Sequence, residues 1–206
     1  MEHIYRSEIL TNSQHGFVNG RSCMTQMLEC LDDWTRILDN DGSVDVIYID
    51  YAKAFDKVAH KRLLIKLEGY GISPQLIQWI GSFLSGRRQK VRVNGAESEW
   101  EDVLSGVPQG SVLGPVLFIL FVNDLPEMIK TKVKMYADDT KIYADVSNEE
   151  NYYKLQEDID SLDKWAHEWQ LSFNTSKCKV MHIGKKNPRK TYTMNQNNCK
   201  TEIEET

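Results

Sequence analysis

The 206-residue chain has few of the features that would tie it to an oxidising compartment, a zinc site or a membrane. Its four cysteines include no C-x-x-C pair and no zinc-type spacing, which indicates free thiols in a reducing compartment. The longest apolar run, residues 112–122, contains glycine and proline and is too short to span a bilayer. Charged residues interrupt the first eight positions, so no signal peptide is predicted. We expect an intracellular, soluble protein without a membrane partner, in the nucleus or the cytoplasm.

An excess of basic charge is also missing. The net charge is −5 and the isoelectric point is near 5.6, which argues against a dedicated nucleic-acid-binding surface. Two local clusters are exceptions, and each could either follow phosphates or be ordinary solvated loop charge. The clusters are Arg87, Arg88, Lys90 and Arg92, and Lys177, Lys179, Lys185, Lys186, Arg189 and Lys190.

Two adjacent aspartates, Asp138 and Asp139, lie between residues that favour strands. Two carboxylates at a tight turn repel each other, so ionising both is unfavourable. A divalent cation removes that conflict, since Mg²⁺ is usually held by one or two carboxylates together with substrate phosphates. The alternative is an ordinary surface turn, in which aspartate is common.

A third carboxylate, Asp50, closes the strand-like run at residues 44–50. Because it is 88 residues from Asp138 (138 − 50 = 88), only the fold could bring the two together, for instance on two strands of one sheet. Three carboxylates so placed could hold two metal ions about 3.5–4 Å apart, as in-line phosphoryl displacement requires. A strand-end cap or an ion-pair partner remains the alternative for Asp50.

Between these segments lies a loop, residues 104–115, with two prolines and three glycines. Such a loop allows the backbone to approach a ligand closely, and Gln109 offers both a donor and an acceptor there. An ordinary loop leading into the following helix is the competing interpretation.

Taken in order, these segments make the chain similar to the reverse transcriptases of non-LTR, LINE-type retrotransposons over roughly residues 10–185. Five stretches carry the resemblance: Gln14-His15-Gly16-Phe17 with Gly20-Arg21-Ser22, the D-x-x-x-A-F-D pattern of residues 50–56, the loop of residues 105–115, Tyr136-Ala137-Asp138-Asp139, and residues 171–179.

The resemblance implies a metal site and a reaction. Asp50, Asp138 and Asp139 would bind two Mg²⁺ ions, with Mn²⁺ as an alternative, in a polymerase that adds dNTPs to a DNA primer on an RNA template. Lys177 would donate a proton to the leaving pyrophosphate, although a solvated surface lysine is an open alternative.

The resemblance also implies residues around the substrates. Phe55 would exclude a ribose 2′-OH, while Gln109 and Gly110 would line the nascent base pair. Tyr51 would bind the nucleotide, and Tyr136 would lie near the primer end, with packing of a strand tyrosine against the core as the competing interpretation for Tyr136. The implied nucleic-acid contacts are Arg21, Arg87, Arg88, Ser105 and Pro108.

The predicted fold is α+β: a right-hand polymerase palm, in which an antiparallel sheet packs on helices, with part of the fingers and no thumb. Residues 1–184 would form the reverse transcriptase domain and residues 185–206 a polar, flexible tail. Periodicity predicts helices over residues 22–39, 57–68, 74–85, 111–123 and 149–170, and strands over 44–50, 89–93, 98–104, 132–137, 140–145 and 178–183.

Two functions remain open at this point, and the sequence leaves the oligomeric state undecided. The chain is either an RNA-directed DNA polymerase or a catalytically inactive remnant that keeps the fold as a nucleic-acid-binding module. The intact aspartates favour the first function, whereas the expected lack of complete fingers and thumb favours the second.

Overall fold

The computed structural model describes residues 2–196 and 199–206, which divide into two compact units. The sheet unit comprises Met1–Ala52 and Val122–Thr206, and the inserted unit comprises Lys53–Phe121. In sequence, the inserted unit therefore separates the first strand of the sheet from all the others.

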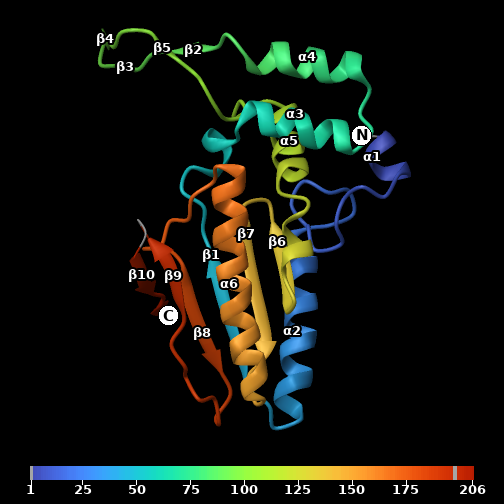
Figure 1. Cartoon of the computed structure of the whole chain (residues 1–206), viewed down its shortest axis with the longest axis vertical. Helices are drawn as coiled ribbons and strands as arrows, with labels where there is room; N and C mark the ends of the chain where they lie inside the picture. Colours follow the sequence, from blue (N-terminus) through green and yellow to red (C-terminus); the bar gives the residue numbers. More distant parts are fainter. Residues whose placement is uncertain (1, 197–198) are drawn as a thin grey trace. The chain divides into compact units, whose positions relative to one another are not determined.

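Five strands form the main sheet of the sheet unit, in the order β11-β8-β1-β7-β6 (Figure 1). Their bounds are Val44–Ile49 for β1, Lys132–Tyr136 for β6, Asp139–Asp145 for β7, Lys179–Ile183 for β8 and Glu204–Glu205 for β11. β1 runs antiparallel to β7 and β8, β6 is antiparallel to β7, and only β11 joins in parallel. All residues of β1 except Tyr48 are buried, as expected for a central strand with both faces covered.

The helix α2 (Cys23–Asp39) contacts β1 and β6. Its start is fixed by a capping box, in which the Ser22 hydroxyl accepts from the backbone of Thr25 and the Thr25 hydroxyl accepts from the backbone of Ser22. Trp34 packs edge-on against Tyr143 of β7, with ring centroids 5.8 Å apart. This helix matches the predicted span and buries one face of the sheet.

The helix α6 (Glu149–Trp169) crosses the sheet and contacts β7 (Figure 1). Asn148 caps its first turn, and Gln170 ends it in the left-handed conformation. Its buried apolar residues recur at three- and four-residue steps, as the sequence predicts: Leu155, Ile159, Leu162 and Ala166.

Residues 185–206, for which a polar, flexible tail is predicted, include short strands in the part that the structure describes. β9 (Thr193–Gln196) pairs with β10 (Cys199–Glu202), and β11 joins the main sheet. The reason is a buried anchor: the Tyr192 hydroxyl donates to Asp45 Oδ2 at 2.7 Å, and Asp45 is fully buried in β1. His182 and Asn187 also hydrogen-bond to Asp45, which leaves this carboxylate well supported.

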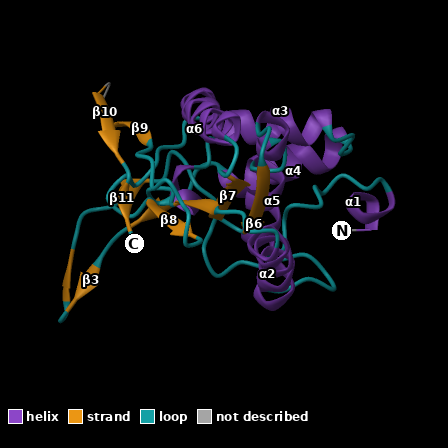
Figure 2. Cartoon of the chain, turned by 90° about the horizontal axis from the view of Figure 1, so that it is seen from below, coloured by secondary structure: helices purple, strands orange, loops and turns teal. Residues whose placement is uncertain are grey.

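Figure 2 shows the helices α3, α4 and α5 of the inserted unit. The unit also has a short 3₁₀ helix and two short two-stranded sheets. Its elements are η1 (Ala54–Lys57), α3 (His60–Gly69), α4 (Pro74–Leu84), β2 (Arg88–Gln89), β3 (Arg92–Val93), β4 (Ala96–Glu97), β5 (Glu101–Asp102) and α5 (Leu113–Phe121). β2 pairs with β5 and β3 with β4, so the strands predicted over residues 89–93 and 98–104 form as two separate short pairs.

The remaining elements, α1 (Glu2–Arg6) and η2 (Leu125–Met128), belong to the sheet unit. Within the described residues, no helix is both long enough and apolar enough to cross a membrane.

Candidate metal centre

The three predicted aspartates meet at one end of the main sheet. Asp50 directly follows β1, Asp138 lies in the turn between β6 and β7, and Asp139 is the first residue of β7. The pairing of Ile49 with Thr140 is the last one between β1 and β7. The next positions along the two strands are Asp50 and Asp139, so an antiparallel register brings these two residues to the same edge.

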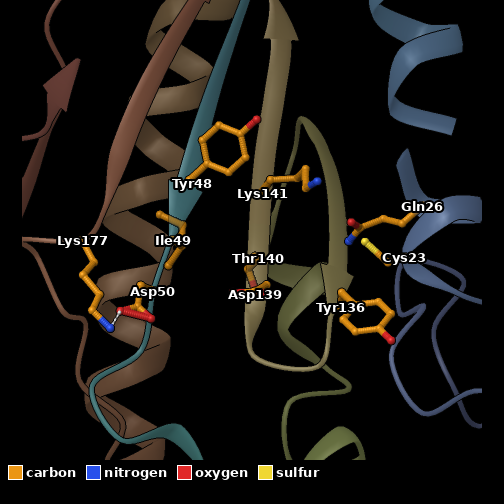
Figure 3. Close-up of a pocket in the computed structure, with 10 residues that line it drawn as sticks. All are labelled: Cys23, Gln26, Tyr48, Ile49, Asp50, Tyr136, Asp139, Thr140, Lys141 and Lys177. Carbon is orange, nitrogen blue, oxygen red and sulfur yellow. Dashed lines mark ion pairs between the residues drawn. The ribbon is translucent and has the colours of Figure 1, made fainter. Parts of the chain in front are cut away.

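A pocket of about 490 Å³ opens at this edge (Figure 3). Asp50 and Asp139 line it together with Lys177 and Tyr136, which the sequence had assigned to the same site. The other lining residues are Cys23, Gln26, Tyr48, Ile49, Thr140 and Lys141. Asp138 is not among them; it is half-buried beside the pocket.

The electrostatics of the site disfavour three free carboxylates. Burial raises the pKa of Asp138 above its ordinary value, and the charges of Asp139 and Asp50 raise it further. Asp50 Oδ2 is buried and, within the described part of the chain, accepts no hydrogen bond. A buried carboxylate oxygen without a donor is unfavourable unless a cation faces it.

These oxygen ligands fit a hard divalent cation such as Mg²⁺. Within the described ranges, however, no three carboxylate, imidazole or thiol side chains already converge on a point that could hold a metal ion. Mg²⁺ does not need such a cage, because it usually keeps several waters and shares its coordination with substrate phosphates. The residues present therefore fit an ion that is completed by substrate.

Lys177 forms an ion pair with Asp50. Its Nζ lies 3.7 Å from Asp50 Oδ2, and 69% of its side chain is exposed (Figure 3). Exposed ion pairs of this kind contribute about 0–1 kcal/mol. Lys177 is thus free to change partners at small cost.

The two predicted tyrosines differ in their surroundings. Tyr136 lines the pocket, whereas Tyr51 is buried with its ring 5.1 Å from that of Phe173. Burial raises the pKa of the Tyr51 hydroxyl strongly. The side chain of Tyr51 therefore packs in the core, whereas the sequence alone had suggested only a nucleotide contact for it.

In the inserted unit, the predicted glycine-rich loop folds against the end of the D-x-x-x-A-F-D motif. Gly106 N donates to Val58 O and Val107 N donates to Phe55 O, both at 2.8 Å. The same loop reaches Asp56 through two side chains: Gln109 Nε2 donates to its carboxylate at 2.9 Å, and Ser105 Oγ donates to its backbone oxygen at 2.7 Å.

Other predicted residues of this unit are arranged around the same loop. Gly110 has a φ of +81°, which favours glycine, and Pro108 O accepts from the Ser111 hydroxyl. The Phe55 ring stacks on that of Phe118, with centroids 4.4 Å apart. The loop and the Phe55 segment are therefore brought together by direct contacts.

Two of the three arginines predicted to bind nucleic acid are engaged with backbone carbonyls. Arg21 donates to Asn12 O and Gln14 O, each at 2.7 Å. Arg87 donates to Leu84 O at 2.8 Å and to Gly106 O at 2.5 Å. Arg88 is more exposed, with Asp102 3.4 Å away and the Trp100 ring beneath its guanidinium.

Sequence reasoning missed two residues that support the aspartates. Cys178 is fully buried, and its Sγ lies 3.5 Å from Asp50 N, so it packs directly behind the first carboxylate. Gln14 is buried against the turn that carries Asp138 and hydrogen-bonds to Ala137. The segment Gln14-His15-Gly16-Phe17 is one of the stretches that carry the family resemblance. Its contact with Ala137 could not be predicted, because no local sequence pattern reports a contact between residues more than 120 positions apart.

Comparisons with known proteins identify the family of the chain. A family model described as "Reverse transcriptase (RNA-dependent DNA polymerase)" matches residues 1–201. The chain is 37% identical over 140 residues to the RNA-directed DNA polymerase from mobile element jockey of Drosophila funebris, covering 64% of the chain and 15% of that protein. It is 33% identical over 178 residues to the probable RNA-directed DNA polymerase from transposon BS of Drosophila melanogaster, covering 82% of the chain and 20% of that protein.

Solved structures show the same fold at low sequence identity. Apo telomerase from Candida tropicalis superposes with a TM-score of 0.62 at 13% identity, covering 93% of this chain and 36% of that one. Telomerase from Candida albicans, solved with a fragment of telomeric RNA, superposes with a TM-score of 0.60 at 12% identity, covering 98% of this chain and 34% of that one. The chain spans only 15–20% of the curated relatives named above. Since the family model matches nearly the whole chain, the chain belongs to the reverse transcriptase (RNA-dependent DNA polymerase) family.

Proposed function

We propose that this chain provides the catalytic palm of an RNA-directed DNA polymerase that joins dNTPs to a primer 3′-OH with two Mg²⁺ ions. One observation carries the proposal: Asp50, from the end of β1, lies beside the Asp138-Asp139 turn, where its buried Oδ2 accepts no hydrogen bond within the described residues and is faced by the exposed ammonium of Lys177 at 3.7 Å. Mn²⁺ has the same preference for oxygen ligands and is the expected substitute.

In this proposal the aspartates hold the ions, and the other pocket residues act on the substrates. When bound, the ions activate the primer hydroxyl and neutralise the triphosphate. Lys177 exchanges Asp50 for the leaving pyrophosphate and donates a proton to it, which its exposed position allows. Tyr136 contacts the primer end from the pocket wall. The protein thus contributes mainly position and charge.

The inserted unit supplies the nucleotide contacts in this proposal. Phe55 is held by its stacking on Phe118, so its ring is rigid enough to discriminate against a 2′-OH. Gln109 and Gly110 face the base pair from the loop, with Ser105 and Pro108 beside the nucleic acid. Tyr51 acts through its backbone, because its side chain is buried.

The test is primer extension by the purified chain on poly(rA)/oligo(dT) with dTTP and Mg²⁺. Extension by the wild type that is lost in Asp138→Asn supports the polymerase. The matched control is Asp41→Asn, which removes the same charge from a side chain that is 89% exposed and outside the pocket. It should extend the primer at the wild-type rate.

A contrary result would favour the second function considered from the sequence. If the wild type binds the primer–template duplex but extends no primer with Mg²⁺ or Mn²⁺, the chain is a nucleic-acid-binding module that keeps the fold. The role of Phe55 is checked separately: Phe55→Ala should increase the incorporation of UMP from UTP relative to dTTP.

A further inference from the structure

The turn that carries Asp138 is enclosed by the N-terminal segment of residues 13–16. His15 N donates to Met135 O and Met135 N donates to Ser13 O, both at 2.8 Å, so this segment runs along β6 like a short additional strand. Gln14 pairs with Met135 in a parallel bridge. The enclosure brings together parts of the chain that lie more than 120 residues apart.

The side-chain amide of Gln14 binds the turn itself. Its Oε1 accepts from Ala137 N at 2.9 Å and from Gly16 N at 2.7 Å, and its Nε2 donates to Ala137 O at 3.3 Å. Ala137 N belongs to the peptide group before Ala137, and Ala137 O belongs to the peptide group that leads into Asp138. One buried amide therefore fixes the peptide planes on both sides of Ala137.

Ala137 needs such support because its φ is +56°, in the left-handed region that disfavours residues with a Cβ. A strained conformation of this kind persists only when its surroundings hold it in place. If Ala137 relaxed, the peptide before Asp138 would rotate and redirect the carboxylate. The direction of Asp138 thus depends on how firmly Ala137 is held.

Gly16 makes the close approach possible. A Cβ at this position would lie 2.3 Å from Ala137 N, which no side chain can tolerate. The segment can therefore lie directly against the turn only because residue 16 is glycine.

We infer that Gln14 is a positioning residue of the catalytic hairpin, which holds Ala137 in its strained conformation so that Asp138 and Asp139 face Asp50 in a shared metal site. This inference rests on the proposed function, because it assigns Gln14 a role toward the ions that the aspartates bind. A merely structural Gln14 would affect stability without a specific effect on metal binding.

The experiment measures Mn²⁺ binding to the purified chain by electron paramagnetic resonance, which quantifies the free ion, alongside thermal unfolding. Gln14→Ala should weaken Mn²⁺ binding about 10- to 100-fold, the usual range when a group that orients a metal ligand is removed. The matched control is Asn123→Ala. Asn123 is a buried amide that holds the same N-terminal segment, through Thr11 N at 2.8 Å and Ile9 O at 2.7 Å, but does not touch the turn.

Asn123→Ala should lower the unfolding temperature but leave Mn²⁺ affinity within about twofold of the wild type. A second variant tests whether strain at Ala137 is the reason for the lost Mn²⁺ affinity. It also provides the test if Gln14→Ala alone fails to fold. In Gln14→Ala/Ala137→Gly, glycine adopts the positive φ without strain, so at least part of the lost Mn²⁺ affinity should return.

Three results are decisive against the inference. Wild-type Mn²⁺ affinity in Gln14→Ala would overturn it while leaving the metal site intact. Equal losses of affinity in Gln14→Ala and Asn123→Ala would show a general structural effect and also overturn it. Absence of Mn²⁺ binding by the wild type, with no change in Asp138→Asn, would overturn both the inference and the proposed function.

Discussion

Asp138 is held half-buried at the turn, beside two other carboxylates. Because its pKa is raised in the folded state, the folded protein loses stability as the pH rises from the unfolded pKa of about 3.9 through the raised folded value. At neutral pH, without metal, the full penalty is present. A site arranged to bind cations is therefore expected to be a weak point of the metal-free protein.

Asp138→Asn should consequently raise the unfolding temperature of the metal-free protein at pH 7.5 while it abolishes primer extension. For a chain of this size, each 1 kcal/mol gained corresponds to about 2–4 °C. Differential scanning calorimetry in the presence of a chelator measures the change. Asp139→Asn is the comparison, since Asp139 is exposed and its neutralisation should give a smaller gain. A lower unfolding temperature for Asp138→Asn would contradict the electrostatic account.

His15 gives a pH dependence of the opposite sign. Its ring is buried, with Nδ1 3.0 Å from Thr25 Oγ1, and burial lowers its pKa despite the nearby charge of Glu29. The unfolded chain therefore binds a proton more readily than the folded one, and stability falls as the pH drops below about 6.5.

The free energy of unfolding in urea should decrease from pH 7.5 to pH 5.5, and His15→Gln should flatten that dependence. A variant that kept the full wild-type slope would show that other groups cause it.

Sequence reasoning at this scale identified the residue types but not their partners. The family resemblance implied nucleic-acid contacts for Arg21 and Arg87, and the structure shows their guanidinium groups donating to backbone carbonyls. The acceptors Asn12 O and Gly106 O lie in irregular segments, so no spacing pattern in the sequence predicts these hydrogen bonds. The aspartates were easier to predict, because strand-forming residues flank them and fix where they project.

At the scale of elements, the strands and helices of the sheet unit follow the predicted ranges closely. β-branched runs and helix caps are local signals, and they set β1, β7 and α6. The ordering of residues 199–206 was not predictable in this way. Ile203 and Tyr192 are buried apolar residues among polar ones; the Tyr192 hydroxyl donates to the distant carboxylate of Asp45, and Ile203 N donates to Tyr192 O.

The loop of the inserted unit offers a matched pair of glycines. Gly106 and Gly110 both have positive φ, +84° and +81°. A Cβ at Gly106 would lie 2.6 Å from Asp56 Cα, whereas a Cβ at Gly110 would meet nothing within 4 Å. Gly110→Ala should therefore lower the free energy of unfolding by roughly 1–2 kcal/mol, the cost of placing a residue with a Cβ in the left-handed region. Gly106→Ala should lower the free energy of unfolding by about 1 kcal/mol or more beyond that, because the added Cβ forces the loop to shift away from Asp56.

Urea denaturation of the two variants gives the comparison directly. Equal losses of stability would mean that the loop moves away from Asp56 without cost.

At the scale of the whole molecule, a net charge of −5 and internally bound arginines predict weak, salt-sensitive binding to a primer–template duplex. Arg88→Ala should reduce the slope of log K against log salt by about 1, because Arg88 is exposed. Arg21→Ala should leave the slope unchanged and lower the unfolding temperature. Fluorescence anisotropy at several salt concentrations measures both slopes, and a reduced slope for Arg21→Ala would show that Arg21 contacts phosphate after all.

The position of β1 in the sheet also affects how the chain is synthesised. Its antiparallel neighbours lie far along the sequence, and β7 begins at Asp139, 90 residues after Ile49 (139 − 49 = 90). Protein synthesis proceeds at roughly 5–20 residues per second, so about 5–18 s pass between the synthesis of β1, with the sequence VDVIYI, and the start of β7. During that interval the apolar side chains and the unpaired backbone groups of β1 are exposed to other chains. We therefore expect this topology to fold slowly and to be prone to aggregation during synthesis.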